Sequence, residues 1–260
     1  MAPTDFRTGS PCWIDLGTPD IDAAAAFYGS VLGWSAVSAG PDTGGYVFLQ
    51  QGGRTVAAAG PLQEPGAATA WTVFFLTPDA EATAKAAEQA GGTVRVPPMD
   101  VMDAGRLVQL TDPTGGRFAA WEAGTTRGLD EVGETGALCW TELHSADLPA
   151  ALGFYRALFG WRSADSGLPG VEYTILSTAD GDDQQAAGFG GAAGPHPGLG
   201  AGWLVHFAVA DTDAAVAATT AGGGTVVLPA ETIPTVGRLA VLADPFGAQF
   251  AVITPDPRQS

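Results

Sequence analysis

The amino-acid sequence predicts an α+β fold built from two tandem domains, and three observations support this prediction. The 260-residue chain repeats itself: residues 12–36 match residues 139–163 at ten of 25 positions, and residues 105–118 match residues 237–250 at eight of 14. A polar stretch rich in Gly and Thr separates the two copies. Each copy shows the order strand, helix, three strands twice. The predicted parts are a first domain at residues 9–123, a linker at 124–135 and a second domain at 136–255.

The first unit of the first domain illustrates how the elements are predicted. Residues 13–16 alternate in polarity and are bounded by Pro and Gly, which is typical of a strand. Residues 20–32 have apolar side chains at helical spacing, with Asp20 as the N-cap and Gly33 at the end. The remaining elements are strands at 34–37, 46–50 and 54–59, then a second unit with a strand at 72–76, a helix at 79–90 and strands at 93–96, 106–110 and 118–121.

The second copy is longer than the first by about five residues, because the offset between the copies rises from 127 to 132. We expect the insertion in the loop at residues 180–183. The Gly-rich stretch 188–202 lacks the features of a phosphate-binding loop, so it is predicted to be the connector between two units. Cys12 and Cys139 occupy the same position in the two copies, and we expect both to be buried and unbonded.

Composition excludes several classes of function. The formal net charge is −17 and the single lysine is Lys85, so we expect no nucleic-acid partner and no binding to anionic membranes. No apolar run approaches the roughly 18 residues of a membrane span, and residues 1–5 lack the pattern of a signal peptide. A cytoplasmic location is therefore expected. Arg106 and Arg238 are equivalent in the two copies and are either anchors for an anionic substrate or members of structural ion pairs.

Two motifs carry a resemblance to a known family. Asp-x-x-x-Ala-x-x-Phe-Tyr-x-x-x-x-Gly-Trp begins at Asp20 and again at Asp147, and Asp-Pro-x-Gly begins at Asp112 and at Asp244. The chain resembles the vicinal oxygen chelate superfamily, which contains glyoxalases, extradiol dioxygenases, and bleomycin- and fosfomycin-resistance proteins. It is similar to two-domain members called glyoxalase-like or hydroxylase-like. The resemblance implies that each domain pairs two βαβββ modules in a mixed sheet curled around a cup, with the helices outside.

The resemblance also implies a divalent metal in each cup, held by His, Gln or Glu on the first and last strands of the modules. Transferred to this chain, these positions carry no suitable donor, because zinc and iron need imidazole, thiolate or carboxylate groups. We therefore expect no cofactor and no divalent metal at the family positions. These positions fall on Trp13, Thr72 and Ala119 in the first domain and on Trp140, Leu204 and Ala251 in the second, with the remaining ones near residues 57–59 and 186–187.

Successive side chains of a strand point to opposite faces of the sheet. One family position that faces the cup therefore predicts which other residues of that strand face it. The predicted lining combines large aromatic rings with a few polar groups, a composition that suits a flat organic ligand. In the first cup the expected ligand-binding residues are Trp13, Asp15, Thr72, Phe74, Arg117 and Trp121. In the second cup they are Trp140, His144, Leu204 and Gln249.

Three polar residues of the second cup are expected to converge, since the opening strands of paired modules lie close together in the family's fold. Glu142 and His206 are the candidate catalytic residues, with His144 beside them. A carboxylate that orients an imidazole is suited to general acid–base catalysis. The same three groups are alternatively an unconventional metal site, or hydrogen-bonded residues without a chemical role.

Three functions follow as hypotheses. The first is a metal-independent small-molecule-binding protein that takes a flat, partly apolar ligand, with a role in drug sequestration or as an accessory to secondary metabolism. The second is an enzyme of the isomerase, lyase or hydroxylase type, or an oxygenase, that uses Glu142 and His206. The third is a scaffold whose cups are both filled by side chains. We expect a monomer or a weak homodimer, because the tandem copy supplies within one chain the pairing that relatives make between chains.

Overall fold

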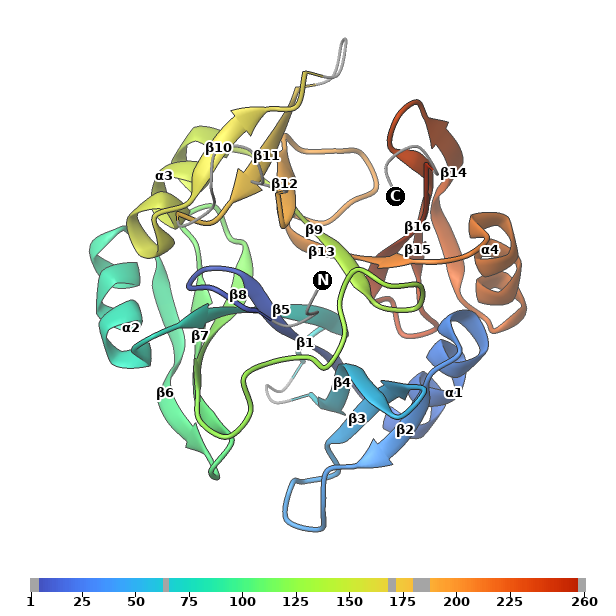
Figure 1. The fold of residues 1–260 in the computed structure, drawn as a ribbon, viewed down its shortest axis with the longest axis horizontal. Helices are drawn as coiled ribbons and strands as arrows, with labels where there is room; N and C mark the ends of the chain where they lie inside the picture. The colour runs from blue at the N-terminus through green and yellow to red at the C-terminus, as the bar shows by residue number, and fades with distance from the viewer. Residues whose placement is uncertain (1–4, 63–65, 168–171, 180–187, 257–260) are drawn as a thin grey trace.

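A computed structural model describes residues 5–62, 66–167, 172–179 and 188–256 of the chain. It confirms the α+β prediction, because these residues form two eight-stranded mixed sheets and four helices (Figure 1). The two sheets have the same strand order, so the two copies in the sequence are two copies in space. The loop predicted to hold the insertion, residues 180–183, lies outside the described residues.

The first sheet has the strand order β2-β3-β4-β1-β5-β8-β7-β6. Its central strands β1 and β5 are antiparallel, and each pairs in parallel on its other side, β1 with β4 and β5 with β8. The elements of this half are β1 (Pro11–Thr18), α1 (Ile21–Leu32), β2 (Ser35–Ser38), β3 (Val47–Gln51), β4 (Arg54–Pro61), β5 (Ala70–Thr77), α2 (Ala80–Gln89), β6 (Thr93–Val101), β7 (Gly105–Thr111) and β8 (Arg117–Ala123).

The second sheet repeats this arrangement in the order β10-β11-β12-β9-β13-β16-β15-β14. The Gly-rich stretch 188–202 is not only a connector, as the sequence predicted, because its residues 190–193 form strand β12 between β9 and β11. The elements of this half are β9 (Leu138–His144), α3 (Leu148–Phe159), β10 (Arg162–Asp165), β11 (Tyr173–Ser177), β12 (Gly190–Ala193), β13 (Gly202–Ala208), α4 (Thr212–Ala221), β14 (Thr225–Ile233), β15 (Gly237–Ala243) and β16 (Gln249–Pro255).

The predicted helix signals are confirmed. The Asp20 side chain accepts a hydrogen bond from the backbone N–H of Ala23 at 2.9 Å and so caps α1. Gly33 ends the helix in the left-handed conformation, with φ of 77°. Asp147 and Gly160 perform the same two functions for α3. These caps fix where α1 and α3 begin and end. The motif that is repeated in the sequence therefore forms the same local structure in both copies.

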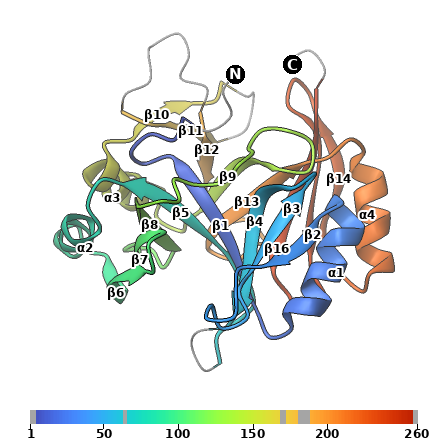
Figure 2. The ribbon, with the colours of Figure 1, turned by 60° about the horizontal axis from the view of Figure 1, so that its bottom comes forward.

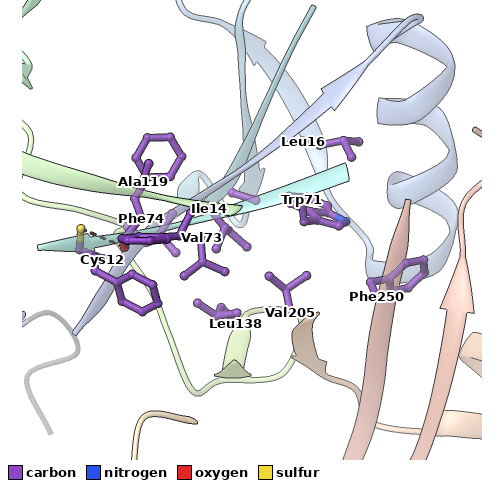
Figure 3. Close-up of a cluster of buried hydrophobic side chains, with 14 of the residues drawn as sticks. Cys12, Ile14, Leu16, Trp71, Val73, Phe74, Ala119, Leu138, Val205 and Phe250 are labelled. Atoms are coloured by element: carbon purple, nitrogen blue, oxygen red, sulfur yellow. Dashed lines mark hydrogen bonds between the residues drawn. The ribbon is translucent and has the colours of Figure 1, made fainter. Parts of the chain in front are cut away.

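The hydrophobic core lies between the two sheets. Ile14 and Val73 of the central strands β1 and β5 project toward Leu138 and Val205 of β9 and β13 (Figure 3). These side chains belong to one continuous buried cluster, which spans both copies. Helix α1 packs beside α4, and α2 beside α3, on two opposite sides of the molecule (Figures 1 and 2). The opposite faces of both sheets, which the core does not cover, are therefore left to form the cups.

The two motifs of the repeat meet across this core. The Tyr28 hydroxyl on α1 donates to Asp244 Oδ2 at 3.2 Å and accepts from the indole N–H of Trp71. In the second copy, the Tyr155 hydroxyl donates to Asp112 Oδ2 at 3.0 Å, and Trp203 donates to it. The Phe-Tyr motif of each domain is thus bonded to the Asp-Pro-x-Gly turn of the other domain.

The structure also shows the contacts of the two equivalent arginines and the state of the two cysteines. Arg106 forms ion pairs with Glu81 and Asp100, and Arg238 forms a bidentate pair with Asp213, so the structural reading of both arginines is confirmed. Both cysteines are free thiols, as predicted; Cys12 is buried, but Cys139 is only partly buried, so the prediction of full burial was wrong for Cys139. Among the described residues, no helix has the length and apolar character needed to cross a bilayer.

Candidate ligand-binding cups

We call the inner face of the first sheet, which carries Trp13, Asp15 and Thr72, the first cup. Alternation along β1 directs Trp13 and Asp15 to this face, while Ile14 between them enters the core. The Trp13 indole N–H donates to the Tyr46 hydroxyl at 3.0 Å, and that hydroxyl donates to Asp15 Oδ2 at 3.2 Å. The cup therefore contains a chain of two hydrogen bonds that ends on a carboxylate.

The inner face of the second sheet, the second cup, repeats this chain with a longer acid. The Trp140 indole donates to the Tyr173 hydroxyl at 2.8 Å, which donates to Glu142 Oε2 at 2.8 Å. Neither tyrosine was among the site residues predicted from the sequence. The signal was nevertheless present, because Tyr46 and Tyr173 are separated by 127 residues, the same offset as the first pair of matched blocks.

Each tyrosine lies over a glycine of the neighbouring strand. A Cβ atom added at Gly191 would overlap the Tyr173 ring and hydroxyl, and one added at Gly60 would overlap the Tyr46 ring. Gly191 is also the register partner of Glu142 on the parallel strand. The absence of a side chain at these positions lets the tyrosine reach the carboxylate.

We expect Gly191→Ala to lower the free energy of unfolding by about 1–3 kcal/mol, because the methyl group must displace the Tyr173 ring. Urea denaturation measures this change. Gly194→Ala is the matched control, since a Cβ at Gly194 meets no atom within 4 Å. Equal stability of the two variants would mean that the Tyr173 ring is not held in this place.

The first cup contains an open cleft of about 140 Å³. Its walls come from both modules of the domain, and they combine apolar surface with hydrogen-bonding groups. Of the residues predicted for this cup, the cleft includes Asp15, Thr72 and Arg117. The described residues that line it are Asp15, Leu16, Gly17, Tyr46, Gly60, Pro61, Leu62, Ala67, Ala68, Ala70, Trp71, Thr72, Arg95, Gln109 and Arg117.

Asp15 is the acid of this cleft. Burial raises its pKa from 3.8 to about 7, although hydrogen bonds from Tyr46 and Thr72 act in the opposite direction. Thr72 is the register partner of Asp15 on β5, which places its hydroxyl beside the carboxyl group. The carboxyl group is therefore able to gain or lose a proton near neutral pH.

The raised pKa of Asp15 predicts a pH-dependent stability. An acid with a raised pKa in the folded state stabilises the fold fully below its ordinary pKa, and this contribution is lost as the pH rises toward 7. Asp15→Asn, which does not titrate, should therefore gain stability relative to the native chain between pH 4 and pH 8, by up to roughly 4 kcal/mol, the free energy that corresponds to the shift. Any hydrogen bond that the amide cannot reproduce adds a loss of stability that is the same at both pH values. Urea titrations at both pH values test it, and a gain that does not depend on pH would contradict it.

Two arginines, Arg95 and Arg117, also line the cleft. Arg95 on β6 donates from Nη2 to Gln109 Oε1 at 2.6 Å, which fixes its guanidinium against β7. Arg117, at the start of β8, is exposed, and its guanidinium forms no hydrogen bond or ion pair within the described part of the chain. The sequence analysis missed Arg95 and Gln109, because both lie on strands to which no family position was assigned.

The second cup is closed at the equivalent place. The 132-residue offset puts Val227, Val241 and Leu204 at the positions of Arg95, Gln109 and Thr72. Leu204 and Val241 form a small apolar cluster with Ala251, and Leu199 and Val227 pack against it. Gln249, the counterpart of Arg117, is bonded through its side chain to the backbone of Gly198 and Gly200. Among the described residues, apolar side chains thus occupy the positions that line an open cleft in the first cup.

The polar half of the second cup brings together Glu142, His144 and His206. His144 Nε2 lies 2.7 Å from Glu142 Oε1, and His206 Nε2 lies 3.8 Å from Glu142 Oε2. Burial raises the pKa of Glu142, but the two imidazoles and the Tyr173 hydroxyl outweigh it and lower the pKa to about 2. Burial lowers the pKa of His206, whereas for His144 the adjacent carboxylate outweighs burial and raises the pKa.

Three residues that were predicted to bind ligand in the first cup contact other parts of the protein instead. Phe74 is buried in the core cluster beside Ala119 (Figure 3). The Trp121 indole donates to the carbonyl oxygen of Thr126 at 2.9 Å, and the residue is 7 % exposed. Trp13 packs edge-on against Phe48, with ring centroids 6.0 Å apart. None of these three residues lines the cleft of the first cup.

The residues at the family's metal positions do not fit a divalent ion. The Trp13 indole is a donor already bonded to Tyr46, and Ala119 and Ala251 are fully buried methyl groups. Residues 186–187, near one of these positions, lie outside the described residues. Within the described ranges, no group of three His, Cys, Asp or Glu side chains is arranged to hold a metal ion.

Comparison with known proteins identifies relatives along nearly the whole chain. A family model described as the Glyoxalase/Bleomycin resistance protein/Dioxygenase superfamily matches residues 12–119 and 137–252. The chain is 39% identical to "Anthracycline biosynthesis protein DnrV" of Streptomyces peucetius over 267 residues, which cover 96% of this chain and 94% of the relative. It is 38% identical to "Putative glyoxylase CFP32" of Mycobacterium tuberculosis (strain CDC 1551 / Oshkosh) over 265 residues, 98% of each chain.

Solved structures show the same fold at lower identity. The chain is similar to 2,2',3-trihydroxybiphenyl 1,2-dioxygenase from Sphingomonas wittichii strain RW1, with a TM-score of 0.64, 15% identity and coverage of 95% of this chain and 91% of that one. A Mn(II)-bound glyoxalase from Novosphingobium aromaticivorans gives a TM-score of 0.63 at 17% identity and coverage of 96% and 89%. By sequence and by fold, the chain belongs to the glyoxalase/bleomycin resistance protein/dioxygenase superfamily, as a two-domain member.

Proposed function

We propose that this chain is a small-molecule-binding protein whose first cup takes one edge of a flat, oxygen-bearing aromatic ligand without a metal. The observation that carries the proposal is the difference between the cups. The first has an open cleft with Asp15, Thr72 and Arg117 on its walls, and the second is packed with Leu204 and Val241 at the matching place. A concave site with apolar walls and a few convergent polar groups is the usual form of a ligand site.

The dimensions of the cleft limit what it can enclose. Its volume of about 140 Å³ is smaller than the roughly 300–1,000 Å³ of sites that enclose drug-sized ligands. A polycyclic ligand would therefore insert one ring and its oxygen substituents, and its other rings would lie at the mouth. The relative named for anthracycline biosynthesis supports a planar polycyclic ligand, and so a role for this chain as an accessory in aromatic secondary metabolism or in drug sequestration.

The experiment is a calorimetric titration with 1,8-dihydroxyanthraquinone. We expect one molecule to bind per chain, and we expect Thr72→Leu to abolish binding, because leucine is the residue that fills the second cup at Leu204. Gln249→Leu is the matched control in the second cup and should bind as the native chain does. Circular dichroism checks that both variants are folded. Undiminished binding by Thr72→Leu would contradict the proposal, as would the absence of binding by the native chain.

Acid–base catalysis in the second cup is a second candidate function. The supporting observation is that His206 Nε2 is buried without a hydrogen-bond partner among the described residues and lies on the side of Glu142 Oε2. Such a nitrogen can accept a proton from a substrate group, or donate one to it, when that group comes within hydrogen-bond distance. Turnover of a test compound that is lost in His206→Ala, with binding retained, would support an enzyme. Turnover that is unchanged in His206→Ala would exclude this role.

A further inference from the structure

The cleft of the first cup concentrates positive charge in an acidic protein. The chain has 11 lysines and arginines against 28 aspartates and glutamates, yet two of its arginines, Arg95 and Arg117, line one cleft of about 140 Å³. Outside the cleft, Arg106 and Arg238 form ion pairs with carboxylates at the surface. Arg117 differs from these, because its guanidinium has no partner within the described ranges and remains available to a ligand.

The cations are specific to the first cup. The second copy has Val227 where Arg95 stands and Gln249 where Arg117 stands. Gln249 uses its amide to bind its own loop, whereas Arg117 makes no such bond. A general requirement of the fold would place the same charge in both copies, so the two arginines are better explained by what the first cup binds.

The geometry holds one guanidinium fixed and leaves the other free. Gln109 bonds Arg95 at 2.6 Å and limits its motion, which reduces the entropy lost when a ligand binds. Arg117 presents the planar fork of donors that matches a carboxylate with two parallel hydrogen bonds. We propose that the first cup selects an aromatic carboxylate, whose two oxygens are bound by Arg117 with Arg95 beside it.

The acid of the cleft sets the orientation of this ligand. Tyr46 and Thr72 are both hydrogen bonded to Asp15, and the Asp15 carboxyl group would repel a second carboxylate when it is ionised. A ligand carboxylate therefore points toward Arg117 and away from Asp15. Its ring then lies between the two walls, against the apolar surface of Pro61 and Leu62. This inference rests on the proposed function, because it names the ligand class of the same cleft.

The test compares two probes of the same shape, anthraquinone-2-carboxylate and the neutral anthraquinone-2-carboxamide, in calorimetric titrations at pH 8. We expect the native chain to bind the carboxylate roughly 10- to 100-fold more tightly than the amide, the ratio typical of a charge-assisted hydrogen bond. Arg117→Gln, which installs the residue of the second cup, should remove this preference. Arg127→Gln, which removes the same charge from the exposed linker, should keep it.

The possible results separate this inference from the proposed function. Equal affinity of the native chain for both probes, or a preference that survives in Arg117→Gln, would overturn the carboxylate assignment and leave the cleft as a ligand site. Binding of neither probe would overturn both. A preference lost equally in Arg117→Gln and Arg127→Gln would reflect overall charge and would also overturn the assignment.

Discussion

Asp112→Ala is expected to lower the free energy of unfolding by about 3–5 kcal/mol, one of the two largest effects in this protein. The carboxylate is 3 % exposed. Its Oδ1 accepts from the backbone N–H groups of Thr114 and Gly116 at 2.8 and 2.9 Å, and its Oδ2 accepts from the Tyr155 hydroxyl of the other domain. Alanine would leave these buried donors unsatisfied, which costs more than the bonds themselves contribute.

Urea denaturation measures this loss, and Tyr155→Phe separates its two parts. The phenylalanine variant keeps the turn and removes the bond between the domains, together with the bond that Tyr155 accepts from Trp203, so we expect a loss of about 1–3 kcal/mol. Asp20→Ala, which removes the exposed cap of α1, should cost about 1 kcal/mol and serves as the control for a local bond. If Asp112→Ala cost no more than Asp20→Ala, the domains would not depend on this contact.

Glu142→Ala is the second change with a large expected effect. The carboxylate accepts from the Tyr173 hydroxyl and lies beside His144, which is 5 % exposed. Removing one member of such a buried group typically costs about 3–5 kcal/mol, because the remaining charge loses its partner. The pKa of His144 should fall at the same time, since its raised value depends on Glu142. Urea denaturation and the pH titration of the His144 ring protons by NMR measure the two effects, and Glu142→Gln, which keeps the shape, should lose less stability.

The contribution of Glu142 depends on pH with a defined sign. Its pKa is lowered from 4.5 to about 2, so the ionised carboxylate stabilises the fold above about pH 4.5, and this stabilisation is lost as the pH falls toward 2. The difference in stability between the native chain and Glu142→Ala should therefore be largest near neutral pH and begin to shrink below pH 4.5. A difference that stayed constant from pH 7 to pH 3 would show that the carboxylate does not act through its charge.

Much of the fold is predictable from the sequence because its signals are local. Residues 20–33 carry both an N-cap, Asp20, and a terminal glycine, Gly33, and the helix has those ends in the structure. Strand β12 escaped prediction for a physical reason. Its residues 190–193 are Gly and Ala, which have no strand preference of their own. The strand forms because β9 and β11 bond it on both sides, and a Cβ at Gly190 would overlap the backbone of Thr141.

The cups were only partly predictable, because their polar residues meet across long stretches of chain. Alternation along β1 correctly places Asp15 beside Trp13, but nothing local to β1 indicates that Tyr46 bonds both. Arg95 lies on β6, the edge strand, four places from β1 in the sheet. It reaches the cleft that contains Asp15 only because the sheet curls, and curvature is a property of the whole sheet rather than of any short segment.

The duplication explains why the two cups differ. Since the two domains support each other through the Tyr28–Asp244 and Tyr155–Asp112 bonds, both copies must keep the fold. The two copies differ in the cup: the second has Leu204 and Val241, members of an apolar cluster, where the first has Thr72 and Gln109, and it has Glu142 beside two histidines.

A crystal structure of the chain with anthraquinone-2-carboxylate tests this account most directly. The account predicts the ring system in the first cup, with the carboxylate within hydrogen-bond distance of Arg117 and the second cup closed by Leu204 and Leu199. A ligand seated in the second cup beside Glu142, with the first cup vacant, would contradict it.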